Sequence, residues 1–209
     1  MFEARISQGL EALSIPFADD QVARLADYLR LLQKWNKIYN LTAIDDERKM
    51  VAYHLLDSLA IHSAIPEQAR CLDVGTGAGL PGIPLAIMLP QTNWVLLDSN
   101  GKKTRFVQQA IAGCGLGNVK VVQARIQDYD ADSSFDVIVS RAFASLLDFM
   151  SSVEHLWQVN TRLITMKTEL SESELSAVDK QGLEFNIAPL QVPGIAEKRS
   201  LVSIQRKEL

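Results

Sequence analysis

From Ala69 onward the sequence alternates between short apolar runs and longer helical stretches, and this alternation limits the possible folds more than any other feature. The apolar runs are short and β-branched, as strands buried on both faces are, and cover residues 69–74, 94–97, 119–122, 137–139 and 163–166. Helical patterns separate them at 82–89, 102–113, 145–157 and 171–180. This alternation predicts a mainly parallel sheet with right-handed crossovers.

The last part of the chain departs from this alternation. Two strand-like runs, Leu183 to Val192 and Lys198 to Gln205, are joined by Pro193-Gly194 with no helix between them. A turn in place of a helix joins antiparallel strands. The sequence therefore predicts seven strands, of which the terminal pair is antiparallel.

Residues 1–64 have a helical pattern throughout. Val22, Leu25, Leu29 and Leu32 recur at the spacing of one helix face, and a second helix is expected from Glu47 to Ser63. Because no linker follows, we predict a helical extension over residues 1–64 that packs on a Rossmann-like unit over residues 65–209, a single compact domain.

The segment Cys71 to Gly82 places four glycines within eight residues, directly after the first predicted strand. Glycine suits backbone that takes positive φ or lies close to a ligand. In a doubly wound sheet, ligands bind outside the carboxyl ends of the strands, near the first crossover. The glycine loop is therefore the predicted ligand site, with a tight turn that holds no ligand as the alternative.

A dinucleotide is one candidate ligand, since Gly77 to Gly82 matches G-x-G-x-x-G. In that fingerprint the first glycine directly follows the strand. Counting from Gly75 puts Leu80 where the third glycine belongs, and counting from Gly77 starts two residues late. A nicotinamide or flavin cofactor thus remains the weaker alternative.

S-adenosylmethionine fits the pattern better. The carboxylate of Asp73 at the strand end suits the ammonium of the methionine moiety, while Gly75, Gly77, Gly79 and Leu80 would form the loop around it. Asp98 ends the second strand and can accept hydrogen bonds from both ribose hydroxyls, although it also suits a helix N-cap. After the third strand, Ile126 would pack on the adenine ring and Gln127 would address its edge.

The composition and the local sequence argue against a membrane span, a signal peptide and a metal site. The chain of 209 residues has 47% hydrophobic residues and a net charge of −4, and no apolar run approaches the roughly 20 residues that span a bilayer. Since residues 1–5 also lack a signal-peptide pattern, we expect a cytoplasmic protein without a membrane. A metal is not expected, because His54, Asp57 and His62 do not form a convincing ligand set. From Gly101 to Arg125 there are five basic residues and no acid, which predicts one positive side.

With these residues in place, the sequence closely resembles the bacterial 16S ribosomal RNA guanine-N7 methyltransferases, the glucose-inhibited division protein B family. The segments that carry the resemblance are Lys34 to Thr42, His54 to Ser58, Asp73 to Pro84, Leu97 to Ser99, Gly101 to Phe106 and Ser140 to Ala144. Two positions depart from the family pattern, because a glutamate is common where Gln127 stands and a glycine where Thr168 stands.

The resemblance implies a class I methyltransferase fold, S-adenosylmethionine as cofactor and S-adenosylhomocysteine as product. It also implies a substrate, a guanine in the 530 loop of 16S ribosomal RNA (position 527), as free RNA, in a precursor or in the 30S subunit. We expect a monomer.

The residues after the fourth strand, Ser140-Arg141-Ala142-Phe143, suit this acceptor. Guanine N7 presents a lone pair, so the transfer needs positioning and no general base. We expect Arg141 to bridge cofactor and substrate as the catalytic positioning residue, with an ion pair to Asp136 or Asp148 as the alternative. Phe143 suits either a splayed-out base or the core, while Trp35 and Tyr39 are expected in the core.

Phosphate contacts are expected from six basic residues, Lys102, Lys103, Arg105, Arg125, Lys167 and Arg199, some of which could be ordinary surface charges. Three other functions stay open at this point. They are a class I methyltransferase for another RNA or a small molecule, a non-catalytic RNA-binding module, and a dehydrogenase.

Overall fold

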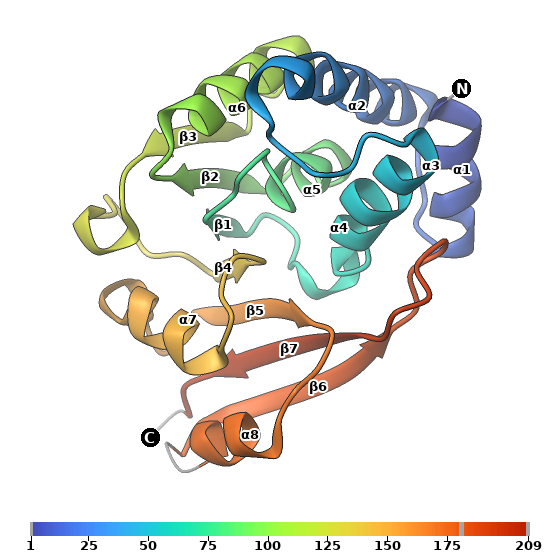
Figure 1. Cartoon of the computed structure of the whole chain (residues 1–209). Helices are drawn as coiled ribbons and strands as arrows, with labels where there is room; N and C mark the ends of the chain where they lie inside the picture. Colours follow the sequence, from blue (N-terminus) through green and yellow to red (C-terminus); the bar gives the residue numbers. More distant parts are fainter. Residues whose placement is uncertain (1, 180–181, 208–209) are drawn as a thin grey trace.

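A seven-stranded sheet forms the centre of the computed structural model, which describes residues 2–179 and 182–207 (Figure 1). The strand order is β3-β2-β1-β4-β5-β7-β6. The strands are β1 (Arg70–Val74), β2 (Asn93–Asp98), β3 (Val119–Gln123), β4 (Val137–Ser140), β5 (Arg162–Lys167), β6 (Glu184–Leu190) and β7 (Arg199–Gln205). Pairs from β3 to β5 are parallel, whereas β7 is antiparallel to β5 and β6. The predicted parallel sheet and antiparallel pair are confirmed.

Two hydrophobic cores lie on the two faces of the sheet. Neighbouring residues of a strand alternate between them, as Leu96 and Leu97 do. The first core contains residues of α5 (Gly82–Met88) and α6 (Gly101–Gly113), and the second contains residues of α7 (Leu146–Val153) and α8 (Glu172–Asp179). A short helical turn, η4 (Glu154–Leu156), completes the predicted stretch 145–157, and Lys180 of the predicted stretch 171–180 lies outside the described residues.

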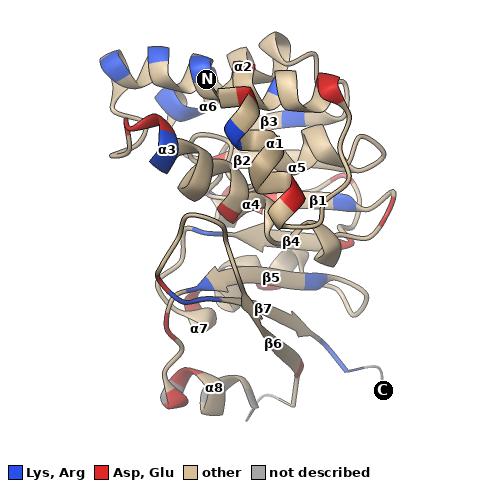
Figure 2. Ribbon diagram, turned by 90° about the vertical axis from the view of Figure 1, so that its right-hand side faces the viewer, with Lys and Arg blue, Asp and Glu red and all other residues tan. Residues whose placement is uncertain are grey.

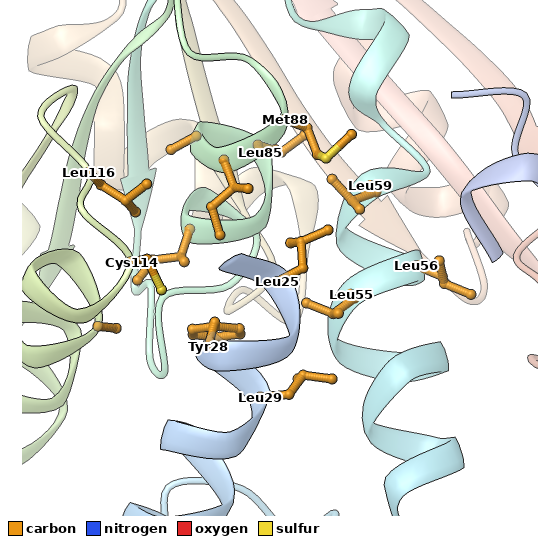
Figure 3. Close-up of a cluster of buried hydrophobic side chains, with 14 of the residues drawn as sticks. Leu25, Tyr28, Leu29, Leu55, Leu56, Leu59, Leu85, Met88, Cys114 and Leu116 are labelled. Atoms are coloured by element: carbon orange, nitrogen blue, oxygen red, sulfur yellow. The ribbon is translucent and has the colours of Figure 1, made fainter. Parts of the chain in front are cut away.

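The helical extension begins with α1 (Phe2–Ala12) and α2 (Asp19–Tyr39). The α2 stripe predicted from the sequence, from Val22 to Leu32, is buried. Figure 3 shows Leu25, Tyr28 and Leu29 of α2 between the segment that carries Leu55 and Leu59 and the neighbourhood of Cys114. One cluster of buried side chains contains residues of both the extension and the sheet, so the extension packs on the sheet. The boundary at residue 64 stays a prediction.

The second predicted helix, 47–63, is divided into several pieces. They are α3 (Glu47–Lys49), the π-helical η1 (Met50–Leu56), α4 (Asp57–Leu59) and the short turn η2 (His62–Ala64). A π-helical segment widens the turn and is common near functional sites. Here it lies directly before Asp57 and Ser58, which are buried polar residues.

One prediction about the core was wrong. Trp35 is half-buried and packs edge-on against Phe106, with ring centroids 5.8 Å apart, but Tyr39 is 39% exposed. The α2 stripe continues to Tyr39, yet the buried contacts end one turn earlier, at Trp35. No helix among the described residues is long and apolar enough to cross a membrane.

Candidate functional site

The glycine loop follows β1 and is held open by left-handed backbone. Gly75, Gly77 and Gly79 have φ values of +69°, +61° and +86°, a region that side chains disfavour. A Cβ on Gly75 would lie 2.8 Å from the Cβ of Ala142, which follows β4. The loops after β1 and β4 therefore meet at a position where only glycine fits.

Asp73 lies beneath this loop and is completely buried. Its Oδ2 accepts hydrogen bonds from Thr76 Oγ1 at 2.6 Å and from the Gly82 amide at 2.9 Å. Its Oδ1 has no partner. Burial raises the pKa of Asp73 to about 6, although the hydrogen bonds from Thr76 and Gly82 oppose that rise. An unpartnered, buried carboxylate oxygen fits a cationic group of a ligand.

Asp98 ends β2 and faces the same loop. Its Oδ2 accepts from the Gly77 amide at 2.9 Å, and its Oδ1 accepts from the Asn100 amide at 2.8 Å. The N-cap of α6 is Asn100, whose side chain accepts from the Lys102 and Lys103 amides. Since Asn100 caps the helix, the N-cap alternative for Asp98 does not hold. Each Asp98 oxygen keeps a lone pair for a further donor.

A pocket of about 380 Å³ opens between the loops that follow β1 to β4. Its lining residues are Val74, Gly75, Leu97, Asp98, Ser99, Lys103, Ala124, Arg125, Ile126, Gln127, Ala142 and Phe143. The pocket thus brings together several residues that the sequence singled out: Gly75, Asp98, Ile126 and Gln127. Ile126 is buried and Gln127 is exposed, which suits one apolar and one polar contact with a planar ring.

Sequence reasoning did not assign Phe143 to this pocket. The Phe143 ring stacks on Phe149 of α7, with centroids 5.3 Å apart, and is half-buried. This contact accounts for the packing role, and the stacking of an RNA base on Phe143 stays a prediction. Leu80, Gly77 and Gly79 do not line the pocket, and neither do Asp73 and Arg141, which the sequence also assigned to the cofactor. Lys103 does, and its ammonium lies 3.9 Å from Asp98 Oδ2, although the sequence suggested only a phosphate contact.

Arg141 turns toward the helical extension. Its guanidinium lies 3.3 Å from Asp57 Oδ2 and donates to Ser58 Oγ at 3.0 Å and to the Tyr53 carbonyl at 3.3 Å. The predicted alternatives, Asp136 and Asp148, are not its partners. Asp136 accepts instead from the Arg70 amide at 2.7 Å. Asp57 lies 84 residues before Arg141, so no local pattern signals this pair.

Asp57 also binds a second arginine. Arg199 Nε donates to Asp57 Oδ1 at 3.1 Å, and the side chain of Arg199 is only 13% exposed. Lys167 is similarly engaged, since its ammonium donates to the carbonyls of Phe143 and Ala144 and lies 3.8 Å from Glu174. Among the six basic residues expected to contact phosphates, Lys102, Arg105 and Arg125 are exposed, whereas Lys167 and Arg199 support neighbouring segments.

His54 belongs to the same neighbourhood but forms no metal site. Its Nε2 lies 3.0 Å from Thr42 Oγ1, while Nδ1 is buried without a partner. Burial, together with the positive charge of Arg141, lowers the pKa of His54 to about 4, which keeps the ring neutral. Within residues 2–179 and 182–207 no group of three or more His, Cys, Asp or Glu could hold a metal ion.

Tyr28 braces the glycine loop from the helical extension. Its hydroxyl, which is completely buried, donates to the Ala78 carbonyl at 2.7 Å. Tyr28→Phe leaves that carbonyl unpaired, so we expect the free energy of unfolding to fall by about 1–3 kcal/mol and the cofactor affinity to fall with it. Urea unfolding and calorimetry measure the two effects.

Tyr53→Phe is the matched control, because the Tyr53 hydroxyl binds Glu197 at the surface. Equal stability of the Tyr28→Phe and Tyr53→Phe variants would contradict a supporting role for Tyr28.

Comparison with known proteins now identifies the family. The family model described as GidB, rRNA small subunit methyltransferase G, matches residues 21–202. The chain belongs to this family. Among relatives called ribosomal RNA small subunit methyltransferase G, that of Nitrosococcus oceani is 46% identical over 200 residues, which is 96% of this chain and 93% of the relative. That of Hydrogenovibrio crunogenus is 43% identical over 206 residues, 99% of this chain and 95% of the relative.

Solved structures agree on the fold of this GidB family member. A SAM dependent methyltransferase from Aquifex aeolicus has a TM-score of 0.61 and 16% identity, and covers 79% of this chain and 97% of its own. The ribosomal protein L11 methylase from Lactobacillus delbrueckii subsp. bulgaricus has a TM-score of 0.55 and 19% identity over 79% of this chain and 81% of its own. The class I methyltransferase fold is confirmed, and S-adenosylmethionine is the cofactor of this family. The dehydrogenase alternative is thereby excluded.

Proposed function

We propose that this protein transfers the methyl group of S-adenosylmethionine to N7 of a guanine in the 530 loop of 16S ribosomal RNA. The observation that carries the proposal is the family match over residues 21–202. The pocket at the carboxyl ends of β1 to β3 supports it, because that is where this fold binds its cofactor.

The site residues fit the cofactor part by part. The unpartnered Oδ1 of Asp73 suits the ammonium, and the free lone pairs of Asp98 suit the ribose hydroxyls. Ile126 and Phe143 offer apolar surface to the adenine, while Gln127 offers an amide to its edge. Gly75, Gly77, Gly79 and Leu80 shape the loop around the methionine part. The bound cofactor supplies an electrophilic methyl group on a sulfonium.

The protein's own contribution to the transfer is placement. N7 of guanine carries its lone pair in the ring plane, so no side chain has to remove a proton, and an in-line approach is what raises the rate. The purine gains positive charge in the transfer, so a hydrogen-bond donor at its carbonyl oxygen serves to orient the ring and not to stabilise the developing charge. Arg141 is the proposed donor, since it follows β4 directly and is 27% exposed while three groups of η1 and α4 hold it.

Methyl transfer tests this function directly. Labelled S-adenosylmethionine is incubated with 30S subunits and with naked 16S RNA from a strain that lacks the enzyme, and the modified nucleotide is mapped. We expect N7-methylguanine in the 530 loop. We also expect light scattering to give the mass of a monomer for the purified protein. Label on another RNA or on a small molecule instead would indicate a class I methyltransferase with a different substrate. RNA binding without transfer would indicate a non-catalytic RNA-binding module.

The comparison between the two substrates decides a finer point. Sequence-specific RNA recognition mostly targets bases that a loop already presents. We therefore expect the 30S subunit or a precursor, in which the loop is folded, to accept methyl groups faster than naked RNA does.

A further inference from the structure

The last turn of α2 exposes two adjacent large hydrophobic side chains. Ile38 is 70% exposed and Tyr39 is 39% exposed, and the other large hydrophobics exposed among the described residues, Leu147 and Val159, lie elsewhere in the chain. The Tyr39 ring is nevertheless held in place, because it packs on Trp35 with centroids 5.1 Å apart and a tilt of 31°. An aromatic ring that is both ordered and accessible can receive a base without losing much conformational freedom.

A chain of three rings fixes where this turn lies. Tyr39 packs on Trp35, and Trp35 packs on Phe106 of α6, which is completely buried. The end of α2 therefore lies beside the first turns of α6, as Figure 1 also shows for the two helices. Lys103 in the first turn of α6 lines the cofactor pocket. The exposed turn is thus a neighbour of the pocket.

This neighbourhood is basic. Lys34 and Lys37 on α2 and Lys102 and Arg105 on α6 are exposed, and none of the four has an ion-pair partner among residues 2–179 and 182–207. Residues 28–44 contain no acid, and neither do residues 101–125. Figure 2 shows lysines and arginines over α2 and α6 at the upper left, with an acidic stretch beside α3 below them. The acids Asp45 to Glu47 come only where the chain has left α2 for α3, away from α6 in Figure 1.

We propose that the α2 end, defined as Lys34, Lys37, Ile38 and Tyr39, is an RNA-contact surface that holds nucleotides flanking the target guanine. Tyr39 stacks on a base, with Ile38 beside it, and Lys34 and Lys37 continue the phosphate contacts of Lys102 and Arg105. Apolar rings within a basic surface are what single-stranded RNA requires, since bases stack and phosphates pair with cations. This inference rests on the proposed function and gives the helical extension a part in substrate binding.

Two substitutions test the surface. Tyr39→Ala should weaken binding of 16S RNA substrate roughly tenfold, because one base loses its stacking partner. Tyr39→Phe should restore that affinity, since the ring is kept. Lys37→Glu should weaken binding and reduce the salt dependence of the affinity. Filter binding on 30S subunits and naked 16S RNA measures both effects, and the Kd for S-adenosylmethionine should stay within about threefold of the parent value.

Matched controls come from the end of the strands that faces away from the cofactor pocket and from the loop between α7 and β5. Lys207→Glu reverses an exposed charge beyond the carboxyl end of β7, which is antiparallel and so ends away from the cofactor pocket. Val159→Ala removes an exposed apolar side chain between α7 and β5. Both controls should bind RNA as the parent does. Equal RNA affinity of Tyr39→Ala, Lys37→Glu and these controls would overturn the proposal.

A crosslinking experiment identifies the occupant directly. A photoreactive Tyr39→p-benzoylphenylalanine variant is irradiated with 30S subunits under turnover conditions. Crosslinks to 16S RNA near the 530 loop support the proposal, whereas crosslinks to a ribosomal protein, or none to RNA, overturn it. If the parent protein methylates no ribosomal RNA, the proposed function itself has failed. If the parent protein methylates the RNA and substitutions in the α2 end do not change methylation, only the proposed RNA-contact surface is rejected.

Discussion

Asp73→Asn is expected to bind S-adenosylmethionine about a hundredfold more weakly than the parent protein. The substitution keeps the shape of the buried side chain but removes the charge that would face the ammonium. The amide oxygen can still accept from Thr76 and Gly82, so its NH2 group then takes the place of the unpartnered Oδ1 and presents a donor to a donor. Removing one partner of a buried, charged hydrogen-bonded pair costs about 2–5 kcal/mol, which agrees with that loss.

Urea unfolding of Asp73→Asn distinguishes a loss of cofactor affinity from misfolding. The ionised Asp73 is buried without a cation in the free protein, so Asp73→Asn should unfold at the same urea concentration as the parent or a higher one at pH 7. Calorimetry then measures the loss of cofactor affinity on a folded protein. An affinity that is unchanged would show that Asp73 serves only to hold Thr76 and Gly82.

The raised pKa of Asp73 adds a pH dependence to the same experiment. Burial raises the pKa of Asp73 to about 6, above its ordinary value of 3.8, so the folded, cofactor-free protein binds this proton more tightly than the unfolded chain does. Its contribution to stability is therefore largest below pH 4 and declines as the pH rises to 6. The cofactor ammonium requires the ionised form, so affinity should fall below about pH 6 and level off above it. Asp73→Asn should remove this pH dependence.

Arg141→Ala is expected to lower kcat by about 10² while the Kd for the cofactor changes little. The proposed role of Arg141 is to orient the guanine, and a displacement of about 1 Å from the reactive geometry can cost about 10²-fold in rate. The guanidinium does not line the cofactor pocket, and Asp57 and Ser58 hold it beside the loop after β4. Single-turnover kinetics on 30S subunits, with cofactor saturating, measure the effect. A loss confined to cofactor binding would contradict the assigned role.

Controls for Arg141 are available within the chain. Arg70→Ala removes an arginine at the amino end of β1, where it pairs with Asp132, and should leave turnover unchanged. Asp57→Asn should lower kcat as Arg141→Ala does, because it removes the charge that orients the guanidinium. The double variant should be no slower than Arg141→Ala alone, since both substitutions disable one unit.

The sheet and the position of the candidate pocket were predictable because their signals are local. Apolar runs identify β1 to β5, and the alternation of glycines before α5 identifies the loop that Asp73 supports. Asp98, Ile126 and Gln127 follow from the rule that parallel strands present their carboxyl ends at one edge. Each of these expectations requires only the positions of the strands along the sequence.

Contacts between distant segments were not predictable. Asp57 joins Arg141 and Arg199 across 84 and 142 residues, and no spacing rule links them. The π-helical η1 looks like ordinary helix in the sequence, since its residues suit either form. Tyr39 was misplaced for a related reason, because a periodic stripe tells which side faces inward but not where the neighbouring helix stops.

The two ion pairs of Asp57 have a consequence for motion. Through these ion pairs the Asp57 carboxylate of α4 binds both the loop after β4 and the start of β7. The positions of three segments from different parts of the chain therefore depend on one side chain. When η1 and α4 open, both arginines lose their partner at once. Amide hydrogen exchange near Arg141 and near Arg199 should then speed up together in Asp57→Asn, as one cooperative unit, while exchange in β1 and β2 stays slow.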